Sequence, residues 1–328
     1  MRAEWLAPFV TFAVCWLLLS WLLRRGRLPM DHPNARSLHA TPTPRIGGVG
    51  IMAGVGVGWI ALGGSYAWLL LASAGALVVV SALDDWRGLP ITWRFMTHAF
   101  VAAAYLFVAM SGNLSILALF ALWIGIIWMI NLYNFMDGSD GLAGGMTLIG
   151  FGCYGLAAWL GGDTELLLLN LCMAAAAAGF LLFNFHPAKV FLGDGGSVPL
   201  GFLAAAMGLI GWARELWPGW FPLLVFSPFI VDATVTLLKR LFRGEKVWQA
   251  HCSHYYQRLV QMGWGHRKTA LAEYLLMGAA GLSAVWAIKM TPAAQYGLIA
   301  VWAVLYLVMM RVTDKRWSQY QTNTPQHE

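Results

Sequence analysis

The sequence predicts an all-α fold, a polytopic bundle of about eleven transmembrane helices. Of its 328 residues, 59% are hydrophobic and 11% are charged, whereas soluble domains average about 45–50% apolar and about 25% charged residues. The hydrophobic residues also occur in long blocks, such as 6–23 and 166–183, close to the roughly 20 residues with which a helix crosses a bilayer. A soluble globular enzyme and a disordered chain are both excluded.

Each expected span corresponds to one apolar block. In chain order the spans cover about residues 5–23, 46–62, 66–83, 95–110, 114–130, 142–160, 165–183, 197–213, 219–238, 271–288 and 294–310. The first is followed by Arg24 and Arg25 and by no small-residue cleavage site, so we expect it to be retained rather than removed as a signal peptide. The second carries glycines four residues apart, which is typical of closely packed membrane helices.

The connections between the spans differ in length and charge on the two sides of the membrane. Short connections lie at 63–65, 111–113, 161–164, 214–218 and 289–293, and long ones at 24–45, 84–94, 131–141, 184–196 and 239–270. Of the 21 lysines and arginines, only Arg2, Arg214 and Lys289 lie on the short-loop side. Because positive charge marks the cytoplasmic side, we expect the N-terminus outside and the C-terminus in the cytoplasm. The net charge of +6 is then a topology signal and requires no nucleic-acid partner.

Aspartates are the most informative residues of the long loops. Asp84 and Asp85 follow the third span, Asp137 and Asp140 follow the fifth, and Asp194 follows the seventh. Solvation at a helix end is the favoured explanation for any single one of them, but it fits the set poorly. Adjacent carboxylates repel unless a cation compensates them, and gathered hard oxygen ligands suit Mg²⁺ or Mn²⁺ together with a substrate phosphate. We therefore expect one membrane domain over residues 1–328 whose cytoplasmic loops form the site.

Amides and glycines accompany these acids. Asn131, Asn134 and Asp137 are spaced i, i+3, i+6, so they lie along one side of a helix if the helix continues that far. The glycines around Asp194 permit a tight turn whose backbone N–H groups could hold an anion. Ser197 is expected to cap the following span.

The last long loop contains His251, His254 and Arg258, spaced i, i+3, i+7, which predicts that they share one helical face. Two interpretations have equal weight: an interfacial helix whose basic face meets anionic lipid, and a clamp for the phosphates of a nucleotide. A zinc site is disfavoured because no cysteine and histidine cluster has the spacing of four ligands.

Together these motifs resemble the polyprenyl-phosphate N-acetylhexosamine-1-phosphate transferases, glycosyltransferase family 4. The matching runs are Asp84-Asp85, Asn131-x-x-Asn134-x-x-Asp137-Gly-x-Asp140, Phe191-Leu-Gly-Asp194-x-Gly-Ser197, the His251 to Arg258 segment and the opening Asp31 to Arg45 segment. They extend over about residues 24–270. Eleven spans and the histidine segment are most similar to the WecA and WbpL-type branch. Cys252 departs from the basic residue that relatives carry between these histidines, which puts one phosphate contact in doubt.

The resemblance implies a reaction: transfer of a sugar-1-phosphate from a UDP-N-acetylhexosamine to undecaprenyl phosphate, with release of UMP. Such a reaction initiates a lipid-linked glycan of the cell envelope, for example O-antigen. The resemblance further implies Mg²⁺ as the cofactor (Mn²⁺ is an alternative), a homodimer, and a multi-pass protein of the bacterial inner membrane with its active site on the cytoplasmic face.

The resemblance also implies residue roles. Asp194 is the expected main Mg²⁺ ligand, with Asp85 and Asn134 as further ligands, and Asp84 or Asp85 binds metal or deprotonates the lipid phosphate. Asn131, Asn134, Asp137 and Asp140 shape the pocket for nucleotide and metal. His251, His254 and Arg258 hold the diphosphate, and Arg36, Arg45 and Lys189 add positive charge.

A polytopic secondary transporter of an anionic or lipid-linked substrate is the alternative from another functional class. It requires ionisable residues near the bilayer midplane and broken helices in repeated halves. His98 and Asp232 are the candidates inside the expected spans, and both are placed near the inner ends. Phosphotransferases of the CDP-alcohol type are disfavoured because their Asp-Gly-x-x-Ala-Arg signature is absent.

Overall fold

The computed structural model of the chain describes residues 3–26, 28–33, 37–39, 41–110, 114–247, 249 and 251–323, with the backbone alone at Ser65, Asp85 and Trp86. The first half contains η1 (Ala3–Leu6), α1 (Ala7–Arg25), β1 (Met30–Asp31), β2 (Thr43–Pro44), α2 (Gly47–Leu62), α3 (Ser65–Arg87), α4 (Ile91–Ala109), α5 (Ile116–Phe135) and α6 (Leu142–Leu160). The second half contains α7 (Thr164–Asn184), α8 (Asp194–Ala213), α9 (Trp220–Val225), α10 (Ser227–Phe242), α11 (Tyr255–Leu259), η2 (Val260–Trp264), α12 (Gly265–Ala287) and α13 (Pro292–Asn323).

The predicted all-α membrane fold is confirmed. Within the described ranges, nine helices are long and apolar enough to cross a membrane, and α2 is a shorter apolar helix. The expected span at 219–238 is divided between α9 and α10, which meet at Phe226. Pro228 lies in the first turn of α10, where its missing N–H costs no helical hydrogen bond. The count of eleven and the sidedness of the termini stay predictions.

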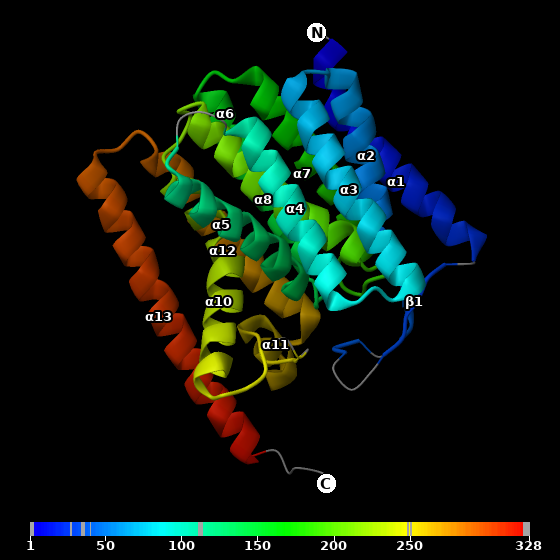
Figure 1. Cartoon of the computed structure of the whole chain (residues 1–328). Helices are drawn as coiled ribbons and strands as arrows, with labels where there is room; N and C mark the ends of the chain where they lie inside the picture. Colours follow the sequence, from blue (N-terminus) through cyan, green and yellow to red (C-terminus); the bar gives the residue numbers. More distant parts are fainter. Residues whose placement is uncertain are drawn as a thin grey trace.

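The bundle has a buried centre and an exposed outer helix. The apolar windows of α6, α7 and α8 are 72%, 67% and 78% buried, whereas that of α13 is 11% buried. Figure 1 shows α13 along the outside of the bundle, with the two termini at opposite ends of the molecule. The described part of α13 continues to Asn323, beyond the expected end of the last span near 310. This extension carries polar residues past the apolar block.

The long loops meet at one end of the bundle, the end that carries the label β1 and α11 in Figure 1. Strands β1 and β2 pair as a short antiparallel ladder, with Asp31 opposite Thr43. The chain after β2 then bonds to the loop before α8, because the N–H of Gly47 donates to the carbonyl of Phe191 at 2.9 Å. A Cβ on Gly48 would lie 2.3 Å from the backbone N of Gly196, so only glycine lets α2 and α8 approach this closely.

Candidate active site

Asp194 lies at the start of α8, where its carboxylate receives donors from three other segments. Arg94 Nη2 donates to Asp194 Oδ2 at 2.6 Å, and Asn134 Nδ2 donates to Asp194 Oδ1 at 3.0 Å. Arg45 Nη2 lies 3.7 Å from Asp194 Oδ1. The carboxylate also occupies the first turn of its helix, where the helix dipole stabilises negative charge. Donors from α4, from α5 and from the residue after β2 therefore converge on one anionic group at the start of α8.

The start of α8 differs from the expectation in one respect. Gly193 is the N-cap and Asp194 is already helical, so Ser197 lies within the first turn and is not the cap. The hydroxyl of Ser197 accepts a hydrogen bond from Asn134 Nδ2 at 2.9 Å and donates to the carbonyl of Gly193 at 3.2 Å. Ser197 thus holds the amide of Asn134 toward Asp194.

Arg94 is a site residue that sequence reasoning missed. Its Nη1 lies 3.0 Å from Asp84 Oδ2 while its Nη2 binds Asp194, so one guanidinium joins two predicted catalytic carboxylates. Asp84 also accepts the backbone N–H of Leu89 at 2.8 Å. No separate sequence signal marks Arg94, because it ends the basic loop 84–94 and is explained by topology alone. The side chain of the neighbouring Asp85 lies outside the described part, and its role stays a prediction.

Asp137 lies in the turn after α5 and lines a cavity beside Asp194. Helix α5 ends at Phe135, so the helix does not continue as far as Asp137, and only Asn131 and Asn134 of the three lie on it. Burial raises the pKa of the Asp137 carboxyl well above its usual range, with Arg45 opposing that rise and Asp194 adding to it. The backbone N–H of Gly193 also donates to Asp137. A buried carboxylate beside a second one favours a cation between them.

Asp140 organises the loops around the site. It is 6% exposed, lies 2.7 Å from His186 Nδ1, and accepts the backbone N–H of Ala188 at 3.1 Å. The ring of His266 stacks on that of His186, and His266 Nε2 donates to the carbonyl of Leu38 at 3.1 Å. Sequence reasoning singled out neither histidine. Asp140 therefore connects the loop after α5, the loop before α8 and the segment before β2.

The histidine loop differs from the expected helical clamp. Helix α11 begins at Tyr255 with His254 as its N-cap, so His251 and His254 precede it, and the expected shared helical face with Arg258 is wrong. Arg258 Nη1 donates to Asp314 of α13 at 2.8 Å. His251 Nδ1 lies 2.8 Å from the hydroxyl of Ser253. Burial lowers the pKa of His251 to about 4, with His254 and Arg240 contributing to the shift, so His251 is neutral at pH 7.

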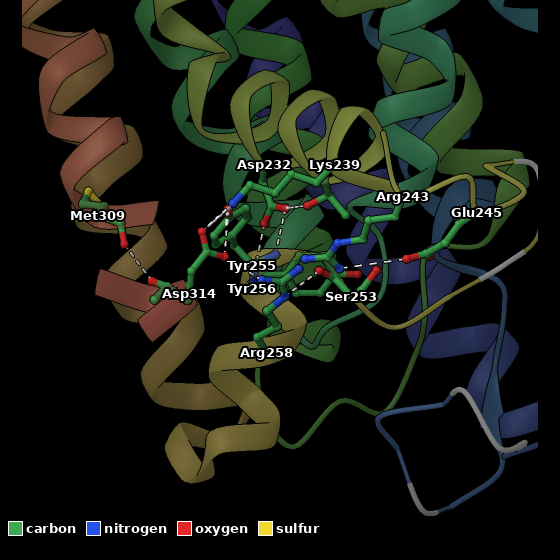
Figure 2. Close-up of polar contacts among 12 residues, drawn as sticks. Asp232, Lys239, Arg243, Glu245, Ser253, Tyr255, Tyr256, Arg258, Met309 and Asp314 are labelled. Carbon is green, nitrogen blue, oxygen red and sulfur yellow. Dashed lines mark hydrogen bonds and ion pairs between the residues drawn. The ribbon is translucent and has the colours of Figure 1, made fainter. Parts of the chain in front are cut away.

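Two aspartates anchor the histidine loop (Figure 2). Asp232 of α10 accepts the backbone N–H groups of Tyr255 and Tyr256 at 2.9 and 3.0 Å, and so satisfies the N-terminus of α11 from another helix. On the other side, Asp314 binds Arg258, Tyr255 and the ammonium of Lys239. These contacts explain why a five-residue helix is placed firmly beside the site.

Three hollows with shared lining residues lie around Arg45, Arg94 and Asn134. A polar cavity of about 380 Å³ is lined by residues that include Asp31, Arg45, Asp137, Asp140, His251 and His266. A junction cavity of about 400 Å³ is lined by residues that include Arg94, His98, Asn131, Asn134, His251 and Gln257. An apolar groove of about 630 Å³ lies along α4, α5 and α10 and includes Trp123, Ile127, Trp128, Leu237 and Leu241.

The junction cavity shares lining residues with each of the other two hollows. His251 and Gln257 line both the polar cavity and the junction cavity. Asn131 and Phe135 line both the junction cavity and the apolar groove. Lys189 is exposed and is not among the lining residues of the polar cavity, and Arg36 lies outside the described residues. The groups that bind Asp194 thus face a polar hollow on one side and lead to an apolar groove on the other.

The donor set fits a hard divalent cation. Across the described ranges, no three acidic, histidine or cysteine side chains are grouped closely enough to hold a metal. However, Asp194, Asp137 and the amide of Asn134 offer oxygen ligands of the kind that Mg²⁺ prefers. The raised pKa of Asp137 is consistent with a carboxylate whose charge needs a further cation.

Comparison with known proteins agrees with this arrangement. The family model for glycosyl transferase family 4 matches residues 67–211. A protein of Bacillus subtilis (strain 168), named a probable undecaprenyl-phosphate N-acetylglucosaminyl 1-phosphate transferase, is 29% identical over 299 residues, which cover 84% of this chain and 83% of the relative.

Two further relatives are similar over comparable lengths. A decaprenyl-phosphate N-acetylglucosaminephosphotransferase of Mycobacterium tuberculosis (strain ATCC 25618 / H37Rv) is 29% identical over 332 residues, covering 84% of this chain and 81% of its own. An undecaprenyl-phosphate alpha-N-acetylglucosaminyl 1-phosphate transferase of Escherichia coli (strain K12) is 27% identical over 308 residues, covering 86% and 81%. The region matched by the family model contains Asp84, Asp137 and Asp194, and the family model and these relatives together support the assignment of the chain to glycosyl transferase family 4.

Proposed function

We propose that this protein transfers an N-acetylhexosamine 1-phosphate from a UDP-sugar to polyprenyl phosphate, with undecaprenyl phosphate as the acceptor. The observation that carries the proposal is the junction cavity, where the groups around Asp194 lie between a polar hollow and an apolar groove. A charged, water-soluble donor and an isoprenoid that stays in the bilayer can meet only at such a boundary. The names of the relatives support undecaprenyl phosphate as the lipid substrate and an N-acetylglucosamine 1-phosphate as the transferred group.

The reaction is an in-line displacement at phosphorus. An oxygen of the lipid phosphate attacks the sugar-proximal phosphorus of the donor, the bond from that phosphorus to the UMP oxygen breaks, and UMP leaves with its electron pair. The products are a prenyl diphosphate sugar and UMP. Because the second pKa of a phosphate monoester is about 6, the acceptor needs no strong base at neutral pH, and positioning with charge neutralisation can supply the catalysis.

The cations of the site have separate tasks in this proposal. Arg45 lines the polar cavity and binds the donor diphosphate, and Arg94 lines the junction cavity and faces the acceptor phosphate. Asp84 holds Arg94 in place through their 3.0 Å contact, so it acts as a positioning residue. His251 adds an N–H donor, and not a positive charge, because it is neutral at pH 7.

Mg²⁺ is the proposed cofactor, with Mn²⁺ as an alternative. Asp194, Asp137 and Asn134 would hold the ion, together with Asp85, and the bound ion would neutralise the developing charge on the diphosphate. Arg258, Lys189 and Arg36 were expected to bind substrate, but the described contacts support no such role for Arg258, whose guanidinium is engaged by Asp314. The active site is proposed to face the cytoplasm of a bacterial inner membrane.

UMP release from purified protein tests the proposal. Undecaprenyl phosphate, Mg²⁺ and a panel of UDP-N-acetylhexosamines are supplied in detergent, and Asp194→Asn is compared with Asp163→Asn. Asp163 caps α7 through the N–H of Leu166 at 2.8 Å, far from the site, and asparagine caps equally well. We expect UMP only with lipid and metal present, a loss of at least about 100-fold in Asp194→Asn, and near-normal activity in Asp163→Asn.

No UMP with any donor, from protein with a normal melting transition, would overturn the proposed function. Release without lipid would also contradict it, because it would indicate hydrolysis of the nucleotide sugar. The active donor in the panel would identify the sugar.

A further inference from the structure

The wall of the junction cavity includes a histidine to which the proposed reaction has assigned no role. His98 of α4 lines this cavity together with Arg94, Asn131 and Asn134. The residue is 6% exposed, and its Nδ1 is buried with no hydrogen-bond partner among the described residues. Buried polar atoms are nearly always paired, so the unpaired Nδ1 shows that the protein leaves this ring incompletely satisfied, and the cavity that His98 lines is where a ligand could supply a partner.

The position of His98 along α4 restricts which ligand reaches it. Helix α4 starts at Ile91, at the same end as the loops, and Arg94 lies in its first turn. His98 follows Arg94 by four residues, which places it about 6 Å deeper along the helix axis and on the same face. A ligand at His98 therefore lies further from the loops than one at Arg94 alone.

The two hollows that adjoin the junction cavity favour an amphiphilic ligand, with a charged head and an apolar tail. Asn131, Phe135 and Phe95 line both the junction cavity and the apolar groove, so an anionic head at His98 lies next to an apolar groove that can receive its tail. The polar cavity meets the junction cavity at His251 and Gln257, on the histidine loop and not on α4. His98 is thus on the wall that the lipid approaches, and the water-soluble donor enters at the other end.

We propose that His98 binds the phosphate of the prenyl acceptor, donating a ring N–H to one of its oxygens beside Arg94. The role is binding, and it sets affinity for the lipid phosphate and not for the nucleotide sugar. The inference rests on the proposed function for the identity of the ligand. It adds a contact that discriminates prenyl phosphate from the uncharged prenol.

Two measurements on His98→Ala and His98→Gln test this role. The first is the shift in Tm that farnesyl phosphate or farnesol causes in the detergent-solubilised protein, since a ligand that binds the native state raises Tm. The second is the KM for undecaprenyl phosphate and for the UDP-sugar in the UMP assay. Met96→Ala is the matched control, because Met96 lies on the same helix and is 60% exposed.

For His98→Ala we expect the farnesyl phosphate shift to be largely lost and the lipid KM to rise about tenfold or more, as for a lost hydrogen bond to a charged group. The KM for the UDP-sugar should stay within about twofold. His98→Gln should recover most of the affinity, because its amide N–H can donate to the same oxygen. Met96→Ala should behave as the wild type.

The outcomes separate this inference from the proposed function. Equal binding of farnesyl phosphate by wild type and His98→Ala, or a rise in the UDP-sugar KM instead of the lipid KM, overturns the role of His98 while the transferase reaction stands. A wild type that farnesol stabilises as much as farnesyl phosphate, or that neither compound stabilises, also overturns it. Binding of farnesyl phosphate that depends on His98, without UMP from any donor, supports the site and contradicts the proposed function alone.

Discussion

Arg94 is the residue on which the geometry of the site most depends. Its two terminal nitrogens contact Asp84 and Asp194, 3.0 and 2.6 Å away, so removal of the guanidinium leaves two carboxylates without their shared cation. A fixed planar fork can pair with two acids at once, whereas an ammonium is a single point charge. The position of Asp194 is therefore set jointly from α4 and α8.

We predict that Arg94→Gln lowers the rate of UMP release by at least about 100-fold, and that Arg94→Lys recovers only part of this loss. Initial rates at saturating lipid and donor measure the effect. Arg311→Gln on the exposed part of α13 is the control for a change of charge. Full activity in Arg94→Lys would contradict the claim that both contacts of the guanidinium are needed.

The neutral state of His251 gives a prediction for pH. Burial lowers its pKa from 6.5 to about 4 in the folded protein. The folded state therefore disfavours protonation, and the stability contributed by the neutral ring is complete above about pH 6.5 and lost as the pH falls toward 4. The melting temperature of the wild type should fall more steeply between pH 7 and 4 than that of His251→Asn. Parallel curves for the two proteins would show that His251 does not titrate in this range.

At the scale of elements, the histidine loop depends on two partners far away in sequence. Asp232 binds the first N–H groups of α11 from α10, and Asp314 holds Arg258 and Lys239 from α13 (Figure 2). A helix of five residues is not stable by itself. Its placement is thus a product of tertiary contacts, and α13 takes part in the site although it is mostly exposed.

We predict that Asp314→Asn lowers stability by about 1–2 kcal/mol, less than for a fully buried pair because Asp314 is about one-third exposed. The loss arises because the guanidinium of Arg258, which is 6% exposed, keeps its charge without a carboxylate. The apparent Tm in detergent measures it, with Lys315→Gln on the exposed side of α13 as the control. An unchanged Tm for Asp314→Asn would show that α13 does not hold the histidine loop.

Most elements could be predicted from hydropathy, but not the places where tertiary structure interrupts it. The apolar block at 219–238 is continuous in sequence, and only Pro228 indicated the break at Phe226 between α9 and α10. Helix α13 continues beyond its apolar block because side chains such as Asp314 bind α11. A hydropathy average over a window of residues indicates neither the break at Phe226 nor the extension of α13.

At the scale of the whole molecule, the loops between distant spans bring the aspartates to one end of the bundle, where the sequence predicts the site. Asp84, Asp137, Asp140 and Asp194 all lie at the loop end of the bundle, and Arg94 links two of them directly. The positions of the aspartates directly after spans predicted this gathering, because the cytoplasmic ends of the spans lie on the same face of the membrane. Arg94 was not singled out from the sequence, and His98 and Asp232 were considered only for the transporter alternative. The partners of Arg94 and Asp232 include residues more than 20 positions away, which the sequence pattern does not indicate.

The proposed function requires a soluble phosphate donor and a membrane-bound acceptor to react in the junction cavity, between the polar cavity and the apolar groove. The product analysis of one reaction tests this central claim most directly. Wild type and Asp194→Asn are incubated with undecaprenyl phosphate, Mg²⁺ and the active UDP-sugar, and UMP and the lipid-linked sugar diphosphate are quantified by mass spectrometry. We predict one UMP for each lipid-linked product in the wild type and neither product in Asp194→Asn. UMP without the lipid-linked product, or equal product from both proteins, would contradict the account.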